Sequence, residues 1–201
     1  MTRVSGKIIG KVAIVGLSAL LLASCSRDGR EMKPPTADQT ETIAIATTIA
    51  ESITSVQELT IAAPWQDGEQ IDAQFTCDGS KLSPSFDIAG LPDGTVTWGL
   101  SIVDQMALDA AHWVAANIDP VINHVDAGVV PAGAVQSLNR LQKVGYAAPC
   151  PKAGEPHTYV LTVYAVSQQL EVSDGMDAET MLTSLEAGSL GITSITFTVT
   201  R

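Results

Sequence analysis

The side chains with the clearest capacity for chemistry are one aspartate and two histidines: Asp104, His112 and His157. An imidazole can donate one N–H to an oxyanion while a carboxylate orients the ring through its other nitrogen. Asp104 can orient a histidine in this way, or it can bind a protonated ligand oxygen. Loop N–H groups can complete a small anion site without any net positive charge. The alternative is that the histidines are packed structural residues and that Asp104 caps a turn.

Two other chemistries use the same residue types. Ser83 with His112 and Asp104 has the composition of a hydrolytic triad. The chain has no Gly-x-Ser-x-Gly segment, however, which would expose a nucleophilic serine. A metal site built from Asp104, His112 and His157 would lack the usual His-x-x-x-His or Cys-x-x-Cys spacing. We therefore predict no catalytic residue, no metal ion and no cofactor.

Short motifs surround these residues in a fixed order. They are Phe75-Thr76-Cys77-Asp78-Gly79 with Ser83-Pro84, Ile102-Val103-Asp104, His112-Trp113-Val114, and Ala148-Pro149-Cys150-Pro151 with His157-Thr158-Tyr159. In this order and at these spacings they resemble the phosphatidylethanolamine-binding protein family, in its bacterial Raf-kinase-inhibitor-like branch. The resemblance covers the later part of the chain. It implies a mainly β fold, an antiparallel β-sandwich with a short C-terminal helix.

The resemblance also implies a ligand site, because the family's motifs line one small pocket for phosphate-like anions. It places Asp104, His112 and His157 in this pocket. It assigns one wall of the pocket to the loop formed by Pro149, Cys150 and Pro151.

Several positions depart from the family pattern. Met106 stands where the family has a second aspartate, Thr158 where it has an arginine, and Val199 where it has a tyrosine. Methionine is apolar and adaptable, so Met106 predicts a less polar pocket. Lys152 replaces a proline of the pocket wall and is a candidate compensating cation.

The N-terminal segment predicts an export signal. Arg3, Lys7 and Lys11 precede a short apolar stretch that ends in Leu22-Ala23-Ser24-Cys25. This pattern is typical of a lipoprotein signal peptide, with lipid attached to the Cys25 thiol. The alternative is an ordinary secreted protein with an incidental cysteine. We expect residues 1–24 to be removed, residues 25–58 to form a lipidated tether, and residues 59–201 to form one domain.

The other two cysteines, Cys77 and Cys150, form an even pair in an oxidising compartment. In the family, the segments that contain them lie close together beside the pocket. The resemblance therefore implies a disulfide between Cys77 and Cys150. The alternative is two buried free thiols.

The net charge of −11 limits the partners. An acidic surface repels nucleic acid and anionic lipid headgroups, so we expect no nucleic-acid partner. Attachment to the membrane must then come from lipid on Cys25, which places the protein on the extracytoplasmic side of a cell membrane.

Strand patterns dominate the predicted domain. Residues 96–102 and 193–199 alternate in polarity as half-buried strands do, and residues 159–166 are apolar enough for a buried central strand. Residues 178–185 carry an apolar stripe at helical spacing. Asp177 can cap the start of this helix, and Gly188 can end it.

These features predict a non-catalytic binding protein with a pocket for a small anionic ligand or a phospholipid headgroup. The alternative is an inhibitor that acts on a protease or another exported protein partner through its surface loops.

Overall fold

The computed structural model describes residues 58–107 and 111–201. The predicted signal peptide, the predicted lipidation site Cys25 and almost all of the predicted tether lie outside the described residues. No helix within these two ranges is long and apolar enough to cross a membrane.

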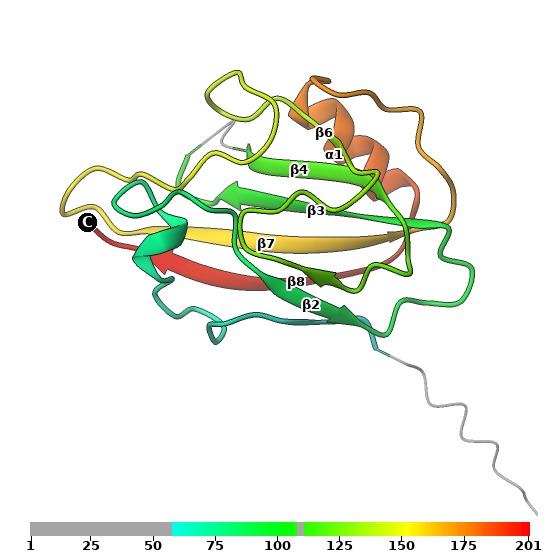
Figure 1. The fold of residues 1–201 in the computed structure, drawn as a ribbon, viewed down its shortest axis with the longest axis horizontal. Coiled ribbons are helices and arrows are strands. Elements are labelled where there is room, and N and C mark those ends of the chain that lie inside the picture. The colour runs from blue at the N-terminus through cyan, green and yellow to red at the C-terminus, as the bar shows by residue number, and fades with distance from the viewer. Residues whose placement is uncertain (1–57, 108–110) are drawn as a thin grey trace, which may run out of the picture. The chain divides into compact units, whose positions relative to one another are not determined.

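Two antiparallel sheets form the domain (Figure 1). The smaller sheet has the order β1-β2-β5, with β1 at Thr60–Ala62, β2 at Phe86–Ala89 and β5 at His124–Val125. The larger sheet has the order β6-β4-β3-β7-β8. Its strands are β6 (Val135–Gln136), β4 (Ala111–Ile118), β3 (Thr97–Asp104), β7 (His157–Val166) and β8 (Ser189–Val199). This architecture confirms the predicted β-sandwich.

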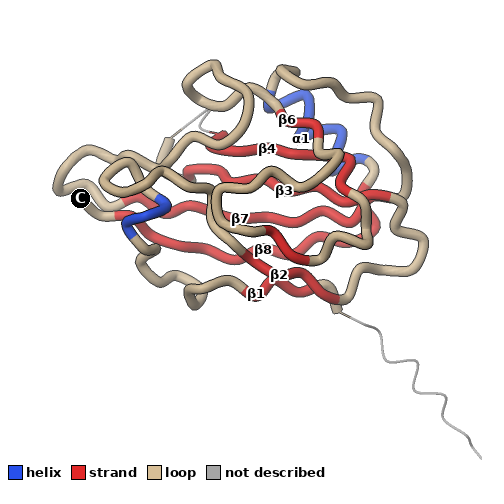
Figure 2. The backbone as a smooth tube through the Cα atoms, viewed as in Figure 1, coloured by secondary structure: helices blue, strands red, loops and turns tan. Residues whose placement is uncertain are grey.

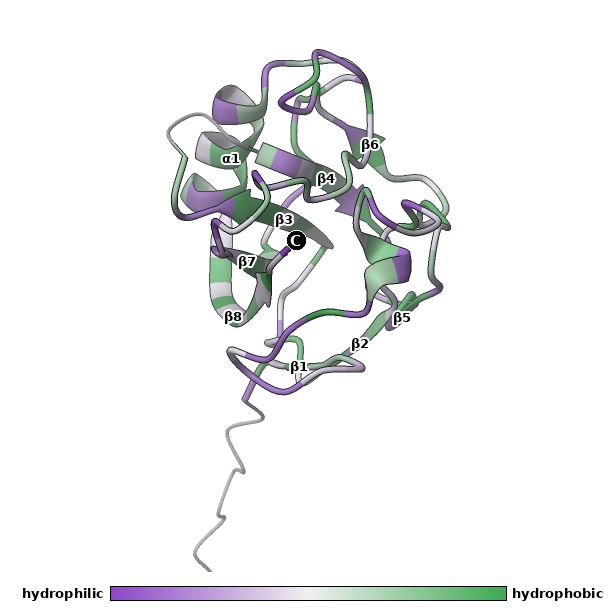
Figure 3. Cartoon of the chain, turned by 90° about the vertical axis from the view of Figure 1, so that its left-hand side faces the viewer, coloured by the Kyte–Doolittle hydropathy of each residue, from purple (hydrophilic) through white to green (hydrophobic). Residues whose placement is uncertain are grey.

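Each face of the larger sheet is covered by a different layer. On one face, Trp98 from β3 packs edge-on against Phe86 from β2, at the centre of the main core. On the other face, Met181 and Leu185 of helix α1 (Ala178–Ala187) pack with Val114 and Tyr164. Figure 3 shows β3 as largely hydrophobic along its length, whereas α1 carries both polar and apolar residues.

The prediction of a half-buried strand at residues 96–102 is wrong. Every residue of β3 is buried except Val103, which is partly exposed. The small residue Gly99 lies under α1, where an added Cβ would stand 2.3 Å from a methyl group of Leu185. The alternation in side-chain size therefore reflects close packing of a helix and not exposure to water.

The other predicted elements are confirmed. Strand β7 pairs with β3 on one edge and β8 on the other, as expected for an interior strand. Asp177 caps α1 by accepting the backbone N–H of Thr180. Gly188 ends the helix without a left-handed backbone, and an added Cβ there would press against Val166.

The loops at one end of the larger sheet are tied together. A disulfide joins Cys77 to Cys150, with their Cα atoms 5.3 Å apart, which confirms the predicted pairing. Arg201 forms an ion pair with Asp78 and donates to the carbonyl of Pro151. In Figure 2 the short 3-10 helix η1 (Ala73–Phe75), the C-terminus and the loop before β7 lie at this end.

Removing the disulfide should destabilise the domain. The bridge closes a loop with a sequence separation of 73 residues. We expect replacement of both Cys77 and Cys150 by serine to lower the free energy of unfolding by about 2–4 kcal/mol. Urea denaturation of the two full-length chains measures this difference. Wild-type protein under reducing conditions should match the double variant, and an unchanged midpoint would argue against a structural role for the bridge.

Candidate functional site

The polar residues predicted to form the pocket gather where four strands of the larger sheet begin or end. Asp104 closes β3, His112 is the second residue of β4, and His157 opens β7. Val199, the last residue of β8, pairs with His157. This end of the sheet is the one crossed by the disulfide-linked loops (Figure 1).

His112 lies at an irregularity between β3 and β4. Ile102 pairs with Trp113, but the next residue, Val103, pairs with Ala111. His112 is therefore the extra residue of a β-bulge, a feature that redirects a side chain out of the regular alternation. Its ring is fully buried and stands edge-on to Tyr159, with ring centres 5.1 Å apart.

The hydrogen bonds of His112 define what it can offer a ligand. Its Nδ1 lies 2.6 Å from the carbonyl oxygen of Ala147. A carbonyl can only accept, so Nδ1 carries the proton and Nε2 of the neutral ring is an acceptor. Nε2 is buried and has no hydrogen-bond partner among the described residues. An orphan of this kind is uncommon in folded proteins, and a ligand or a buried water would satisfy it.

Burial keeps the His112 ring neutral. It lowers the pKa of His112, since the charged form is poorly solvated inside the protein. The hydrogen bond to Ala147 and the charge of Asp104 act in the opposite direction, while the positive charge of Arg140 adds to the lowering.

Asp104 orients His157 and not His112. Its Oδ2 accepts from Nδ1 of His157 at 2.7 Å, and its Oδ1 accepts the backbone N–H of Met106 at 2.9 Å. The Asp104 side chain is only 4% exposed, whereas His157 is 22% exposed. The pair therefore connects the buried part of the site to its rim.

Tyr159 is a site residue that the sequence analysis missed. It pairs directly with Asp104 across β3 and β7 and contacts the rings of both His112 and His157. Burial, followed by the charge of Asp104, raises the pKa of its phenol. The sequence signal for Tyr159 is its place at the end of the His157-Thr158-Tyr159 motif, whereas strand patterning marks it only as a core residue.

The predicted wall loop lies beside His112. Ala147 precedes Pro149 by two residues, and its N–H donates to the His112 carbonyl at 2.7 Å while its own carbonyl accepts from the ring. Pro149 also accepts the backbone N–H of Cys77 at 3.0 Å. Contact of Pro149, Cys150 and Pro151 with a ligand stays a prediction.

Two of the substituted positions do not act as expected. The Met106 side chain is 65% exposed, so it does not make the buried site less polar. Lys152 pairs with Glu155 at 2.8 Å on the exposed loop.

The hydroxyl of Ser83 accepts the N–H of Gly128, and within the described ranges no hydrogen bond connects it to His112 or Asp104.

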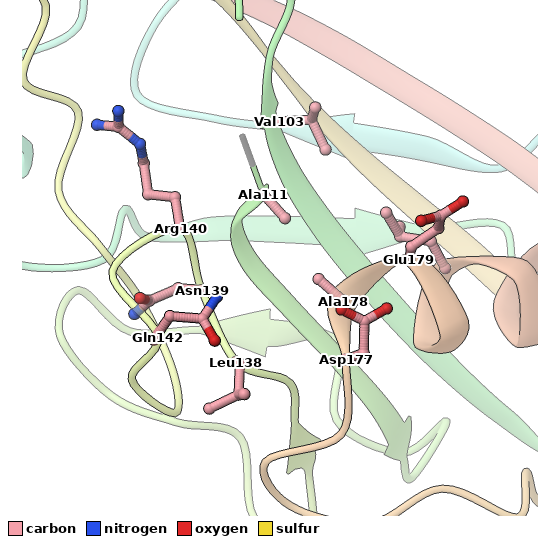
Figure 4. Close-up of a pocket in the computed structure, with 10 residues that line it drawn as sticks. Val103, Ala111, Leu138, Asn139, Arg140, Gln142, Asp177, Ala178 and Glu179 are labelled. Atoms are coloured by element: carbon pink, nitrogen blue, oxygen red, sulfur yellow. The ribbon is translucent and has the colours of Figure 1, made fainter. Parts of the chain in front are cut away.

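A separate hollow of about 680 Å³ lies between α1 and the loop that follows β6 (Figure 4). Its lining contains none of the predicted site residues: Val103, Ala111, Leu138, Asn139, Arg140, Gln142, Asp177, Ala178, Glu179 and Leu182. Figure 4 shows Arg140 on the wall opposite the start of the helix. The hollow borders Val103 and Ala111, whose neighbours in sequence are Asp104 and His112.

Comparison with known proteins identifies the family and the fold. A family model described as phosphatidylethanolamine-binding protein matches residues 62–200. A UPF0098 protein of Methanothermobacter thermautotrophicus is 34% identical over 134 residues, which cover 63% of this chain and 88% of that protein. The UPF0098 protein YbcL of Escherichia coli is 30% identical over 146 residues, which cover 64% of this chain and 80% of that protein.

Two solved structures share the fold. A homologue of phosphatidylethanolamine-binding protein from Chlamydia trachomatis superimposes with a TM-score of 0.67 at 22% identity, covering 72% of this chain and 99% of that one. Escherichia coli YbcL superimposes with a TM-score of 0.65 at 24% identity, with the same coverage of each chain. From the family match over most of the described residues, the chain belongs to the phosphatidylethanolamine-binding protein family.

Proposed function

We propose that this protein is a non-catalytic binding protein that holds a small phosphate-like anion at the end of the larger sheet. The observation that carries the proposal is the orphan Nε2 of His112, which is buried and has no partner among the described residues. The same end of the sheet also holds Asp104, His157 and Tyr159. Such a convergence of polar groups inside an apolar domain is typical of a ligand site.

A catalytic role has less support. The one serine considered as a nucleophile, Ser83, accepts a hydrogen bond from the backbone N–H of Gly128. Asp104 and His157 form a hydrogen-bonded pair that contains no nucleophilic hydroxyl or thiol. The His112 ring is hydrogen-bonded to a backbone carbonyl. This arrangement can bind and orient a ligand, but it contains no activated attacking group.

We further propose that lipid on Cys25 anchors the protein to the extracytoplasmic face of a membrane. The support is the Leu22-Ala23-Ser24-Cys25 motif behind a basic and then apolar leader. Each buried methylene of an attached lipid contributes about 0.8 kcal/mol, and two or more chains give stable attachment.

The ligand proposal predicts a thermal shift. At a phosphate concentration about a hundredfold above Kd, binding should stabilise the full chain by about 2.7 kcal/mol. Replacing His112 by alanine should abolish the shift in Tm, because it removes the group that the ligand contacts. His124→Ala is the matched control, since the exposed side chain of His124 on strand β5 pairs with Asp87 and Asp126.

An equal shift in the His112→Ala variant would refute the site. No shift in any variant, together with a protein partner that is still captured after His112→Ala, would favour the alternative of an interaction protein that acts through its surface loops. The Tm of each ligand-free variant must be measured first, because His112 is also part of the packing.

The anchoring proposal is tested separately. In cells that express the full chain, Cys25→Ser should move the protein from the membrane fraction to the soluble fraction, because serine cannot form the thioether. The Cys77→Ser and Cys150→Ser pair is the control for loss of thiols elsewhere. Continued tight attachment of the Cys25→Ser variant to membranes would contradict the lipidation.

A further inference from the structure

We propose that this site selects ligands that bring a hydrogen-bond donor. It binds a phosphate-containing ligand that has an O–H or N–H, and it rejects an anion that has neither. The inference rests on the proposed function, because it concerns the ligand of the same site. It reverses the expectation that an imidazole N–H would donate to the anion.

The first step concerns His112. Its only N–H in the neutral ring is Nδ1–H, and this proton is already donated to Ala147 at 2.6 Å. The atom left for a ligand, Nε2, therefore presents a lone pair. A fully ionised oxyanion would bring its own lone pairs against Nε2 and be repelled.

The second step concerns Asp104, which is the nearest acid. A carboxylate has only acceptor sites, and Asp104 accepts from Nδ1 of His157 and from the N–H of Met106, with the hydroxyl of Tyr159 as a third neighbouring donor, so at least one lone pair remains. Asp104 is buried, so water does not screen its charge effectively. Nε2 of His112 and the carboxylate of Asp104 therefore both present lone pairs. Each needs a hydrogen-bond donor on the ligand.

The third step concerns the charge of His112, because a protonated ring would make Nε2 a donor and remove the need for a donor on the ligand. The charged groups near this ring are Asp104 from β3, His157 from β7 and Arg140 from the loop after β6. Asp104 favours a positive ring, but burial, Arg140 and His157 oppose it, and the net effect is a lowered pKa of His112. Near neutral pH the ring stays an acceptor.

The cations elsewhere do not change this result. Arg201 pairs with Asp78, and Lys152 pairs with Glu155. Both are therefore committed to carboxylates, and the cation nearer the ring, Arg140, supplies a single positive charge that the negative charge of Asp104 opposes. A monoanion that keeps a proton suits the site better than a dianion without one.

A comparison of sulfate with phosphate distinguishes a site that requires a donor on the ligand from a site that accepts any small anion. Sulfate has no proton near neutral pH, inorganic phosphate keeps at least one hydroxyl, and a phosphate monoester such as methyl phosphate loses its last proton near a pKa of about 6. Isothermal titration calorimetry of the full chain with all three ions, at pH values of about 6, 7 and 8, measures the preference.

We expect sulfate to bind at least about a hundredfold more weakly than inorganic phosphate, because it leaves buried acceptors unpaired. The affinity for methyl phosphate should fall about tenfold for each pH unit above its pKa, since only the protonated fraction is competent to bind. The affinity for inorganic phosphate should fall much less as the pH rises, because this ion keeps a hydroxyl.

Asp104→Asn tests the role of the carboxylate, because the amide replaces one acceptor with an N–H donor. It should narrow the difference between phosphate and sulfate by about tenfold or more. The matched control is Asp87→Asn on β2, where the carboxylate pairs with the exposed His124. It should leave the ratio unchanged. If Asp104→Asn does not fold, the comparison of ions and pH values on the wild-type chain still decides the question.

A final arm separates a lipid headgroup from free phosphate. Glycerophosphoethanolamine and glycerophosphocholine carry the same glycerol hydroxyls, but only the ethanolamine compound adds N–H donors. Binding of the ethanolamine compound alone among the two assigns the donor to a headgroup. Binding of inorganic phosphate but of neither diester assigns it to free phosphate.

Equal affinity for sulfate and phosphate, or pH-independent binding of methyl phosphate, would overturn the donor requirement while leaving an anion pocket in place. Failure of every one of these probes to bind would instead refute the proposed function, and the donor requirement with it.

Discussion

A strand that is buried on both faces leaves little room for polar side chains, and this constraint decides where chemistry can occur in the domain. β3 and β4 lie between the smaller sheet on one side and α1 on the other. Burying an unpaired polar group costs about 1–3 kcal/mol, so such groups are rare in these layers. His112 is the exception, and the bulge that displaces it also brings its Nδ1 to the carbonyl of Ala147. Occupation of Nε2 by a ligand would recover the cost.

The loops around the site are held by bonds that do not involve the site itself. The Cys77–Cys150 disulfide and the pairing of Arg201 with Asp78 connect segments from the start, the middle and the end of the domain. The hydroxyl of Tyr146 adds a bond of 2.7 Å to the carbonyl of Phe75. Because the backbone of Ala147 lies in one of these segments, its carbonyl has a fixed direction, and the protonation pattern of His112 follows from it.

Much of the fold could be predicted from the sequence, because helix caps, apolar stripes and strand alternation are local signals. Asp177 and Gly188 do bound the helix. What the sequence could not give was the second layer over β3, since a small residue such as Gly99 can mean either exposure or a close helix. The resemblance identified Asp104, His112 and His157 as a group. It did not show that Asp104 bonds to His157, or that a bulge commits Nδ1 of His112 to the backbone, because both depend on pairing between distant strands.

The most direct test of this account is the protonation state of the His112 ring in the ligand-free full chain. A proton–nitrogen NMR spectrum that correlates the ring nitrogens with the ring protons reports both the tautomer and its titration, and substitution of His124 and His157 in turn assigns the signals. Near neutral pH we expect a neutral ring with the proton on Nδ1. Because burial lowers its pKa, the ring should take up a second proton only below the usual value of about 6.5. A ring that is charged near neutral pH, or that carries its proton on Nε2, would make His112 a donor and contradict the account.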